Sequence, residues 1–405
     1  MTRPLKHLVS ALVVFAALAY SVAGGGSAGA QLPSRLWKHG ALTSVSCPTT
    51  SLCWAVGFAV PTMSGGPPST PRILMTTNGG QTWTTQKVPG RVCEQSSGCP
   101  PTPVSLESIA CPTTHKCVAV GAYGYANSPA ATGMIDTTTN AGLTWRSVVL
   151  PAPVSGERKN SGPVLSQVVC PNTKDCWAVG NGWKTVRNAT GIGPVAVIYA
   201  TTDGGGTWQA QKTPRTPVGG TSSLTSISCR SVKDCLVIED NGTMTMPYSD
   251  RRPTVLSTTN SGASWVVQKV PASVTGLNAI ACSSVSSLCT ATGYTGGEDA
   301  EHGVIEATKN DGRTWRQVFA APTLNLDGIT CHSTACVVLG TTNSYQQVVV
   351  TGPQWAAHPG APISADGVAC PSANKCIAVG SYGTDLRAVV VTTNQAKTWG
   401  HVLQM

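Results

Sequence analysis

Charged residues are scarce in this sequence. Lys and Arg number 27 and Asp and Glu 18, so 11% of the 405 residues are charged, less than half of the roughly 25% in an average soluble domain. This composition argues against a disordered, charge-rich tail. Basic residues form no cluster larger than a pair such as Arg251 and Arg252. We therefore expect no nucleic-acid partner, because proteins that bind nucleic acids need a basic patch or stripe.

Catalytic signatures are also missing. The sequence has no Gly-x-Ser-x-Gly, no His-Glu-x-x-His and no glycine-rich phosphate loop. A glycosidase needs two carboxylates facing one sugar. The densest acidic group is Glu298, Asp299 and Glu301 with His302, which we interpret as a solvated loop tip, with an acid/base cluster or a cation site as the alternative. We expect no catalytic residues, no metal and no cofactor, and activity as an enzyme is left open.

Long apolar runs are absent after the first thirty residues. Arg3 and Lys6 precede an apolar run from Leu8 to Ala23, and Ala28-Gly29-Ala30 follows with the small-x-small form that a signal peptidase accepts. The pattern predicts a signal peptide over residues 1–30. A membrane anchor is the alternative, but the run is shorter than the roughly 20 residues of a span. We expect a secreted protein, extracellular or periplasmic, with no stable membrane span after cleavage.

Glycine and proline are abundant, with 43 and 28 residues, so turns must be frequent and helices scarce. The chain repeats a two-part unit seven times, with a mean spacing of about 53 residues. The first part reads LTSVSCPTTSLCWAVG at Leu42–Gly57, and copies begin at Leu106, Leu165, Leu224, Leu277, Leu326 and Ala365. The second part, TTNGGQTW, ends at Trp83, with copies ending at Trp145, Trp208, Trp265, Trp315 and Trp399 and a decayed copy, VTGPQW, at Trp355.

Each repeat contains four short segments with strand character. In the first repeat they contain Val45 and Cys47, then Cys53–Val56, then Ile73–Met75, then Trp83 onward. One four-stranded sheet cannot bury both faces alone, whereas radial stacking buries each face against a neighbour. The sequence therefore predicts one all-β domain over residues 31–405, a seven-bladed β-propeller of four-stranded antiparallel blades. The segment around Trp37 could complete the last blade and close the ring.

The second part of the unit is a turn with defined roles for its residues. Asn78, or Asp203 in the third copy, can fold its side-chain oxygen onto following N–H groups, and Gly80 can take a positive φ. Trp83 supplies a large apolar face for packing between blades. The pattern resembles the Asp-box (BNR) repeat of sialidase-like and photosystem-assembly-factor-like propellers. The resemblance implies the fold, with the boxes as peripheral elements remote from any active centre. Sialidases of this kind use three arginines, a Tyr/Glu pair and an acidic general acid, and the sequence matches none of these sets.

Sixteen cysteines form eight pairs separated by four to six residues, and each repeat carries one pair between its first two strand segments. We expect eight short-range disulfides rather than zinc sites, which favour two-residue gaps and bring two pairs together. Disulfides also fit an oxidising compartment. The predicted pairs are Cys47/Cys53, Cys93/Cys99, Cys111/Cys117, Cys170/Cys176, Cys229/Cys235, Cys282/Cys289, Cys331/Cys336 and Cys370/Cys376.

The connections between second and third strands vary in length and carry aromatic and charged residues. Loops on a rigid scaffold concentrate binding residues. We predict a secreted, non-enzymatic binding or scaffold propeller that presents these loops to a protein or a cell-surface glycan, and the alternative is a glycoside hydrolase or lyase of sialidase-like ancestry. The candidate ligand-binding residues are Trp183, Arg187, Tyr248, Asp250, Arg251, Arg252 and Tyr294.

Overall fold

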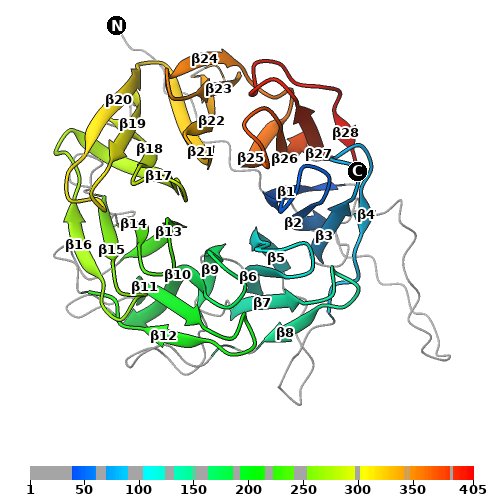
Figure 1. Cartoon of the computed structure of the whole chain (residues 1–405), viewed down its shortest axis with the longest axis horizontal. Coiled ribbons are helices and arrows are strands. Elements are labelled where there is room, and N and C mark those ends of the chain that lie inside the picture. Colours follow the sequence, from blue (N-terminus) through cyan, green and yellow to red (C-terminus); the bar gives the residue numbers. More distant parts are fainter. Residues whose placement is uncertain are drawn as a thin grey trace, which may run out of the picture. The chain divides into compact units, whose positions relative to one another are not determined.

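Strands form where β-branched and apolar residues fill short stretches between turns. A computed structural model of the chain describes residues 39–60, 70–89, 104–123, 132–148, 150, 163–185, 192–214, 222–240, 253–296, 302–342, 344, 346–383 and 386–405. Seven four-stranded antiparallel blades surround a central axis, so the chain is a seven-bladed β-propeller, as predicted (Figure 1). The described part of the chain contains no helix, and hence none that could cross a membrane.

Consecutive strands build each blade from the axis outward. Blades 1 to 4 comprise β1 (His39–Ser46), β2 (Cys53–Val60), β3 (Thr70–Thr76) and β4 (Thr84–Thr85); β5 (Val104–Ala110), β6 (Cys117–Tyr123), β7 (Thr132–Thr138) and β8 (Arg146–Val148); β9 (Val164–Val169), β10 (Cys176–Thr185), β11 (Ile192–Thr201) and β12 (Gln209–Gln211); and β13 (Ser223–Cys229), β14 (Cys235–Asp240), β15 (Thr254–Thr258) and β16 (Val266–Lys269).

Blades 5 to 7 repeat this order. They comprise β17 (Val274–Cys282), β18 (Cys289–Thr295), β19 (His302–Thr308) and β20 (Arg316–Ala321); β21 (Leu324–His332), β22 (Ala335–Thr342), β23 (Gln347–Thr351) and β24 (Ala356–Pro359); and β25 (Ser364–Ala369), β26 (Cys376–Tyr382), β27 (Leu386–Thr392) and β28 (Leu403–Gln404). The first strand of every blade is innermost and the last is outermost (Figure 1).

The hydrophobic core is divided among the interfaces between blades. Trp54 and Ile73 of blade 1 pack with Leu106 and Trp145 of blade 2 in one buried cluster. Equivalent clusters join each following pair, and Leu42 and other residues of blade 1 pack against blade 7. The tryptophan that ends each TTNGGQTW-like segment lies at the interface with the preceding blade. This confirms the packing role predicted for Trp83 and its counterparts.

Among the described residues, the first and last blades exchange no strand. The outer strand of blade 7 is β28, which pairs with β27, whereas β1 meets β27 only at the His39–Leu386 bridge. The place that the segment around Trp37 was expected to fill is therefore taken by β28, and that segment lies outside the described residues. Lys375 Nζ also donates to the carbonyl oxygen of Thr50, 2.7 Å away, and links blade 7 to blade 1.

Two sets of turns share one face of the ring. We call them the disulfide turns, between the first and second strands of a blade, and the Asn/Asp turns, between the third and fourth. They touch within a blade: the Gly79 N–H donates to the Ser51 carbonyl at 2.7 Å. We call this side the turn face and the opposite side the connection face, because the connections between second and third strands end there. This arrangement follows from four antiparallel strands, as predicted.

The Asn/Asp turns have the internal bonds expected from their sequence. Asn78 Oδ1 accepts the N–H of Thr82 at 2.9 Å, and Asp203 Oδ1 accepts those of Gly206 and Thr207. Gly80 has a φ of 94°, in the left-handed region. These bonds hold the chain reversal that positions the packing tryptophan, so the motif has the structural role that was predicted.

Seven of the eight predicted disulfides are present, and Cys93 and Cys99 lie outside the described residues. Each bond closes a disulfide turn and joins the end of the first strand to the start of the second. The bonds are Cys47–Cys53, Cys111–Cys117, Cys170–Cys176, Cys229–Cys235, Cys282–Cys289, Cys331–Cys336 and Cys370–Cys376.

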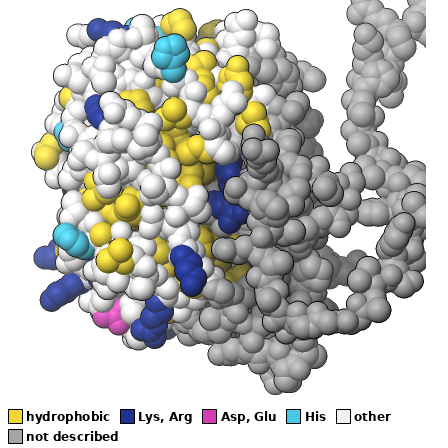
Figure 2. All heavy atoms as spheres, turned by 90° about the vertical axis from the view of Figure 1, so that its right-hand side faces the viewer, with side chains coloured by type: hydrophobic (Ala, Val, Ile, Leu, Met, Phe, Trp, Pro, Cys, Tyr) yellow, Lys and Arg dark blue, Asp and Glu magenta, His cyan; other side chains and the backbone are white. Residues whose placement is uncertain are grey.

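The outer rim reflects the low charge of the sequence. Figure 2 shows the side of the ring around β4 and β28, where neutral side chains dominate among the described residues. Lys and Arg side chains are scattered there instead of forming a stripe.

Candidate functional site

The described residues cover only part of the predicted ligand-binding set. Tyr294 lies near the end of β18 and is half-buried, and Trp183 lies in β10, where only the backbone is described. The remaining candidates, Arg187, Tyr248, Asp250, Arg251 and Arg252, lie outside the described residues.

A feature that the sequence reading missed lies at the axis. The innermost strand of every blade shifts its pairing register at the same point, as between Leu42 and Ser44 in β1. A β-bulge leaves one residue outside the ladder and redirects its side chain. The bulge residues of the seven blades are Thr43, Glu107, Ser166, Thr225, Asn278, Asp327 and Asp366; in β21 the shift also includes Gly328.

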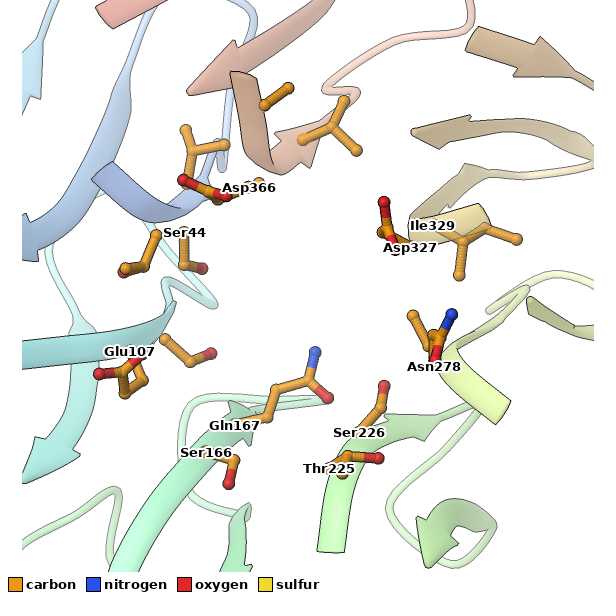
Figure 3. A pocket seen from close by; sticks show the side chains of 18 of the residues that line it. Ser44, Glu107, Ser166, Gln167, Thr225, Ser226, Asn278, Asp327, Ile329 and Asp366 are labelled. Atoms are coloured by element: carbon orange, nitrogen blue, oxygen red, sulfur yellow. The ribbon is translucent and has the colours of Figure 1, made fainter. Parts of the chain in front are cut away.

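These seven polar residues line one cavity of about 390 Å³ at the centre of the ring, which we call the central cavity. Figure 3 shows Asp327 and Asp366, from blades 6 and 7, at the edge of the central space, and Gln167 reaching toward its middle. Three carboxylates, those of Glu107, Asp327 and Asp366, contribute to the lining. The lining contains no Lys, Arg or His side chain among the described residues.

In four of the seven blades the residue after the bulge connects neighbouring blades. In blades 1 to 4 its side chain accepts a hydrogen bond from a backbone N–H of the next blade's innermost strand. The pairs are Ser44 with Ile109 (3.3 Å), Ser108 with Val168 (3.2 Å), Gln167 with Ile227, and Ser226 with Ile280 (3.1 Å). A hydroxyl or amide that accepts one bond keeps its own hydrogens for donation. This half of the wall therefore offers donors to the cavity.

The other half of the wall lacks these linking side chains. In blades 5 to 7 the residue after the bulge is Ala279, Gly328 or Gly367, which have no polar side chain. The bulge residues Asp327 and Asp366 supply carboxylates instead. The cavity thus presents hydroxyl and amide groups together with three carboxylates, Glu107 in blade 2 and Asp327 and Asp366 in blades 6 and 7.

The surroundings of the two aspartates disfavour their charged forms. The pKa of Asp366 is raised to about 6. Burial is the main cause, and repulsion by the Asp327 and Glu107 carboxylates adds to it. Burial also raises the pKa of Asp327. Both side chains are accessible to solvent in the cavity, but the surrounding protein limits hydration of the carboxylates and no cation in the lining compensates. Asp366 therefore takes up a proton as the pH falls through about 6.

A second cavity of about 310 Å³, the side cavity, shares Thr225, Asn278 and Asp327 with the first. Its lining adds Tyr294, together with Asp240 and Pro253. These last two residues immediately precede and follow residues 241–252, the connection that carries Tyr248, Asp250, Arg251 and Arg252. The structure thus places Tyr294 beside the two ends of the connection that holds four other predicted residues.

The central cavity could have been partly inferred from the repeat alignment. The motif Leu-x-Ser-Val/Ile places a variable polar residue between a buried leucine and a buried β-branched residue. With strict alternation, the leucine and the β-branched residue three positions later would lie on opposite faces of the blade. Because both are buried, the pattern indicates a bulge between them.

The chemistry at the axis is unlike the three-arginine site implied by the sialidase resemblance. Among the described residues, no group of three or more His, Cys, Asp or Glu side chains could hold a metal ion.

Comparison with known proteins reveals similarity in fold only. No family model and no curated protein matches the chain. Among solved structures, the β-propeller domain of the Trilobed protease from Pyrococcus furiosus is 9% identical, with a TM-score of 0.54 over 91% of this chain and 96% of that chain. Hydrazine synthase of Kuenenia stuttgartiensis is 11% identical, with a TM-score of 0.50 over 94% and 99%. A sialidase from Trypanosoma rangeli is 8% identical, with a TM-score of 0.46 over 88% and 54%.

Proposed function

We propose that this chain is a non-enzymatic binding propeller that holds a glycan in its central and side cavities. The observation that carries the proposal is the convergence of one polar bulge residue from every blade on a single cavity. Bulges are frequent next to functional sites, where they redirect a side chain. The rigid ring also presents the variable loops of the connection face, where binding residues concentrate.

A glycan is favoured over a protein by the lining of the cavities. Protein interfaces draw most of their binding energy from buried aromatic and arginine side chains. The central cavity instead presents hydroxyl, amide and carboxylate groups, which form hydrogen bonds with the hydroxyls of a sugar. Its volume of about 390 Å³ lies within the range of about 300–1,000 Å³ that is typical of small-ligand sites. Such a site suits the terminal sugars of a glycan.

The proposed ligand is encountered outside the cytoplasm. The signal peptide predicted over residues 1–30 directs the chain to the extracellular space or the periplasm. The seven disulfides support this location, because disulfides persist in oxidising compartments.

We also infer that the Asn/Asp turns are Asp boxes in which Asn has replaced Asp at five of six positions, with a role in folding alone.

The proposal is tested by screening the purified full chain on an array of glycans and, in parallel, against extracted surface proteins. We expect a glycan to bind. Replacing Trp183, Arg251 and Arg252 together by Ala, or Asp327 by Asn, should weaken binding at least tenfold, which is about 1.4 kcal/mol. The matched control is Asp203→Asn on the turn face, which should leave affinity unchanged.

Three results contradict the proposal. The first is the absence of any bound glycan. The second is a bound protein that the glycan array does not explain. The third is a glycan whose affinity falls with Asp203→Asn in a folded variant but not with the Asp327 or connection-face variants.

Asp327 and Asp366 favour a glycoside hydrolase as a second candidate. Both carboxylates contribute to one cavity, and the raised pKa of Asp366, about 6, suits a general acid. Purified protein should nevertheless show no turnover of aryl glycosides or sialosides, because the arginines that the resemblance requires are absent from the described lining. Turnover above background that Asp366→Asn abolishes would establish the hydrolase instead.

A further inference from the structure

The ring of Tyr294 rests directly on the backbone of the neighbouring strand. Tyr294 in β18 pairs with Gly276 in β17. A Cβ atom at position 276 would overlap the Cζ, Cε1 and hydroxyl oxygen atoms of Tyr294. The phenol ring therefore occupies the space of the missing side chain, and only glycine permits this position.

Blade 5 is the only blade with this pair. The equivalent pairs in the other blades are Ala41 with Phe58, Ser105 with Ala122, Val164 with Asn181, Ser223 with Asp240, Asn325 with Thr341, and Ser364 with Ser381. Each of them has a side chain at the position of Gly276. The contact of an aromatic ring with a glycine is thus a local departure from the repeat, and it lies beside the side cavity.

Both residues line the side cavity, together with polar groups. Thr275 Oγ1 donates to the carbonyl oxygens of Tyr294 (3.3 Å) and Gly296 (2.9 Å), which fixes the end of β18. Asn278 Nδ2 donates to the Leu326 carbonyl at 2.8 Å, and its Oδ1 is an acceptor. The aromatic ring is therefore held in place on a wall whose polar groups are oriented by the backbone.

We propose that Tyr294, seated on Gly276, is a stacking platform for one unit of a neutral saccharide. The carbon-bound hydrogens on one face of a sugar ring carry slight positive charge and suit the negative face of an aromatic ring. Its hydroxyls can donate to the carboxylate of Asp327, which also lines the cavity. Hydrogen bonds to ionised acceptors are the stronger kind.

The charge of the cavity selects against acidic sugars. The described lining of the side cavity contains two carboxylates and no Lys, Arg or His. An anionic sugar would face the like charge of the Asp327 carboxylate, which disfavours binding. A preference for anionic sugars would have to come from Arg251 and Arg252, outside the described residues. The inference rests on the proposed glycan-binding function and specifies the class of glycan and the residue that holds it.

The test is isothermal titration of the purified full chain with soluble neutral oligosaccharides: lactose, maltotriose, cellotriose, mannotriose and chitotriose. The matched acidic probe is 3′-sialyllactose, which adds one carboxylate sugar to lactose. We expect at least one neutral oligosaccharide to bind, and 3′-sialyllactose to bind at least tenfold more weakly than it.

Variants of the platform separate stacking from a general effect on the fold. Tyr294→Ala should weaken binding at least tenfold, and Gly276→Ala should weaken it similarly because the new methyl group displaces the ring. Tyr294→Phe should keep affinity within about threefold, since the ring remains. Asn325→Ala, at the position of Gly276 in blade 6, is the control and should have no effect. The Tyr294→Phe and Tyr294→Ala comparison stands even if Gly276→Ala fails to fold.

The outcomes distinguish this inference from the proposed function. Tighter binding of 3′-sialyllactose, unchanged affinity in Tyr294→Ala, or binding of none of the neutral probes overturns the inference. If the affinity for a glycan found on the array still falls with Asp327→Asn and with the triple variant of Trp183, Arg251 and Arg252, the proposed function survives although this inference fails. If no glycan of any kind binds, both fail together.

Discussion

Asp136 provides the most direct test of the energetics of this fold. It lies on β7, on the same side of the strand as Met134, which packs in the interface between blades 1 and 2. Its side chain is fully buried. Ser147 Oγ donates to its Oδ1 at 2.6 Å, while Oδ2 has no hydrogen-bond partner among the described residues. Burial raises the pKa of Asp136 to about 6, although the Ser147 bond opposes the shift.

The sign of the pH dependence follows from this shift. The unfolded chain releases the Asp136 proton near the ordinary pKa of 3.8, whereas the folded chain holds it up to about 6. Between these values the folded state binds more protons, so stability falls as the pH rises and the loss is complete above pH 6. Roughly two pKa units correspond to about 3 kcal/mol, at 1.36 kcal/mol per unit.

Asp136→Asn should therefore stabilise the protein above pH 6. The amide oxygen still accepts the Ser147 bond, and the side chain stays neutral at every pH. Relative to wild type, we expect a gain of up to about 3 kcal/mol at pH 7 to 8 and little difference at pH 4. For a unit of about 370 residues, with an unfolding entropy of about 2.1 cal/mol/K per residue, this is a rise of about 4 °C in the melting temperature.

The assay is thermal unfolding followed by tryptophan fluorescence between pH 4 and pH 8, under non-reducing conditions and at one scan rate. Asp203→Asn is the contrast: hydrogen bonds from Thr207 lower the pKa of the Asp203 carboxyl, so its charge is favourable and its removal should slightly lower the melting temperature at pH 7. The exposed position keeps that effect small. Parallel pH profiles for wild type and Asp136→Asn would refute the reasoning.

Two further predictions concern the turns. Gly80 and Gly383 both have positive φ, but a Cβ at Gly80 would lie 2.7 Å from Val391 Cγ2, whereas one at Gly383 would have no atom within 4 Å. Gly383→Ala should therefore cost about 1 kcal/mol from backbone strain alone, and Gly80→Ala about 1–2 kcal/mol more, measured by denaturant unfolding; equal losses would show that the contact with Val391 is irrelevant. Thiol titration of the denatured, non-reduced protein should find no free thiol, which includes the predicted Cys93/Cys99 bond, and more than two thiols per chain would contradict the complete set of disulfides.

The disulfides and the Asn/Asp turns could be predicted from the sequence because their interactions are local. Cys47 and Cys53 are separated by six positions, and Asn78 bonds within its own turn to Thr82. The same pattern recurs along the chain with a period near 53 residues, so each copy supports the interpretation of the others. Strand number, blade number and the packing of Trp83 follow from that repetition.

The candidate site could not be predicted in the same way. Along β1, alternation of inward and outward side chains fails at Thr43, because the bulge adds one residue to the strand. The residues chosen from the sequence were aromatic and charged loop residues, of which Tyr294 proves to line a cavity. The bulge residues are polar, and their residue types alone do not distinguish them from solvent-facing residues.

The sequence by itself determined the blade, because the four strands that pair with one another in each blade come from one repeat. Only the tertiary structure decided what the centre of the ring contains. Seven segments, each from a different repeat, contribute one bulge residue to the central cavity, and their meeting depends on the closure of the ring between β1 and blade 7. Tertiary packing likewise shifts the pKa values of Asp136 and Asp366, because burial between blades and around the axis removes water that a linear sequence cannot reveal.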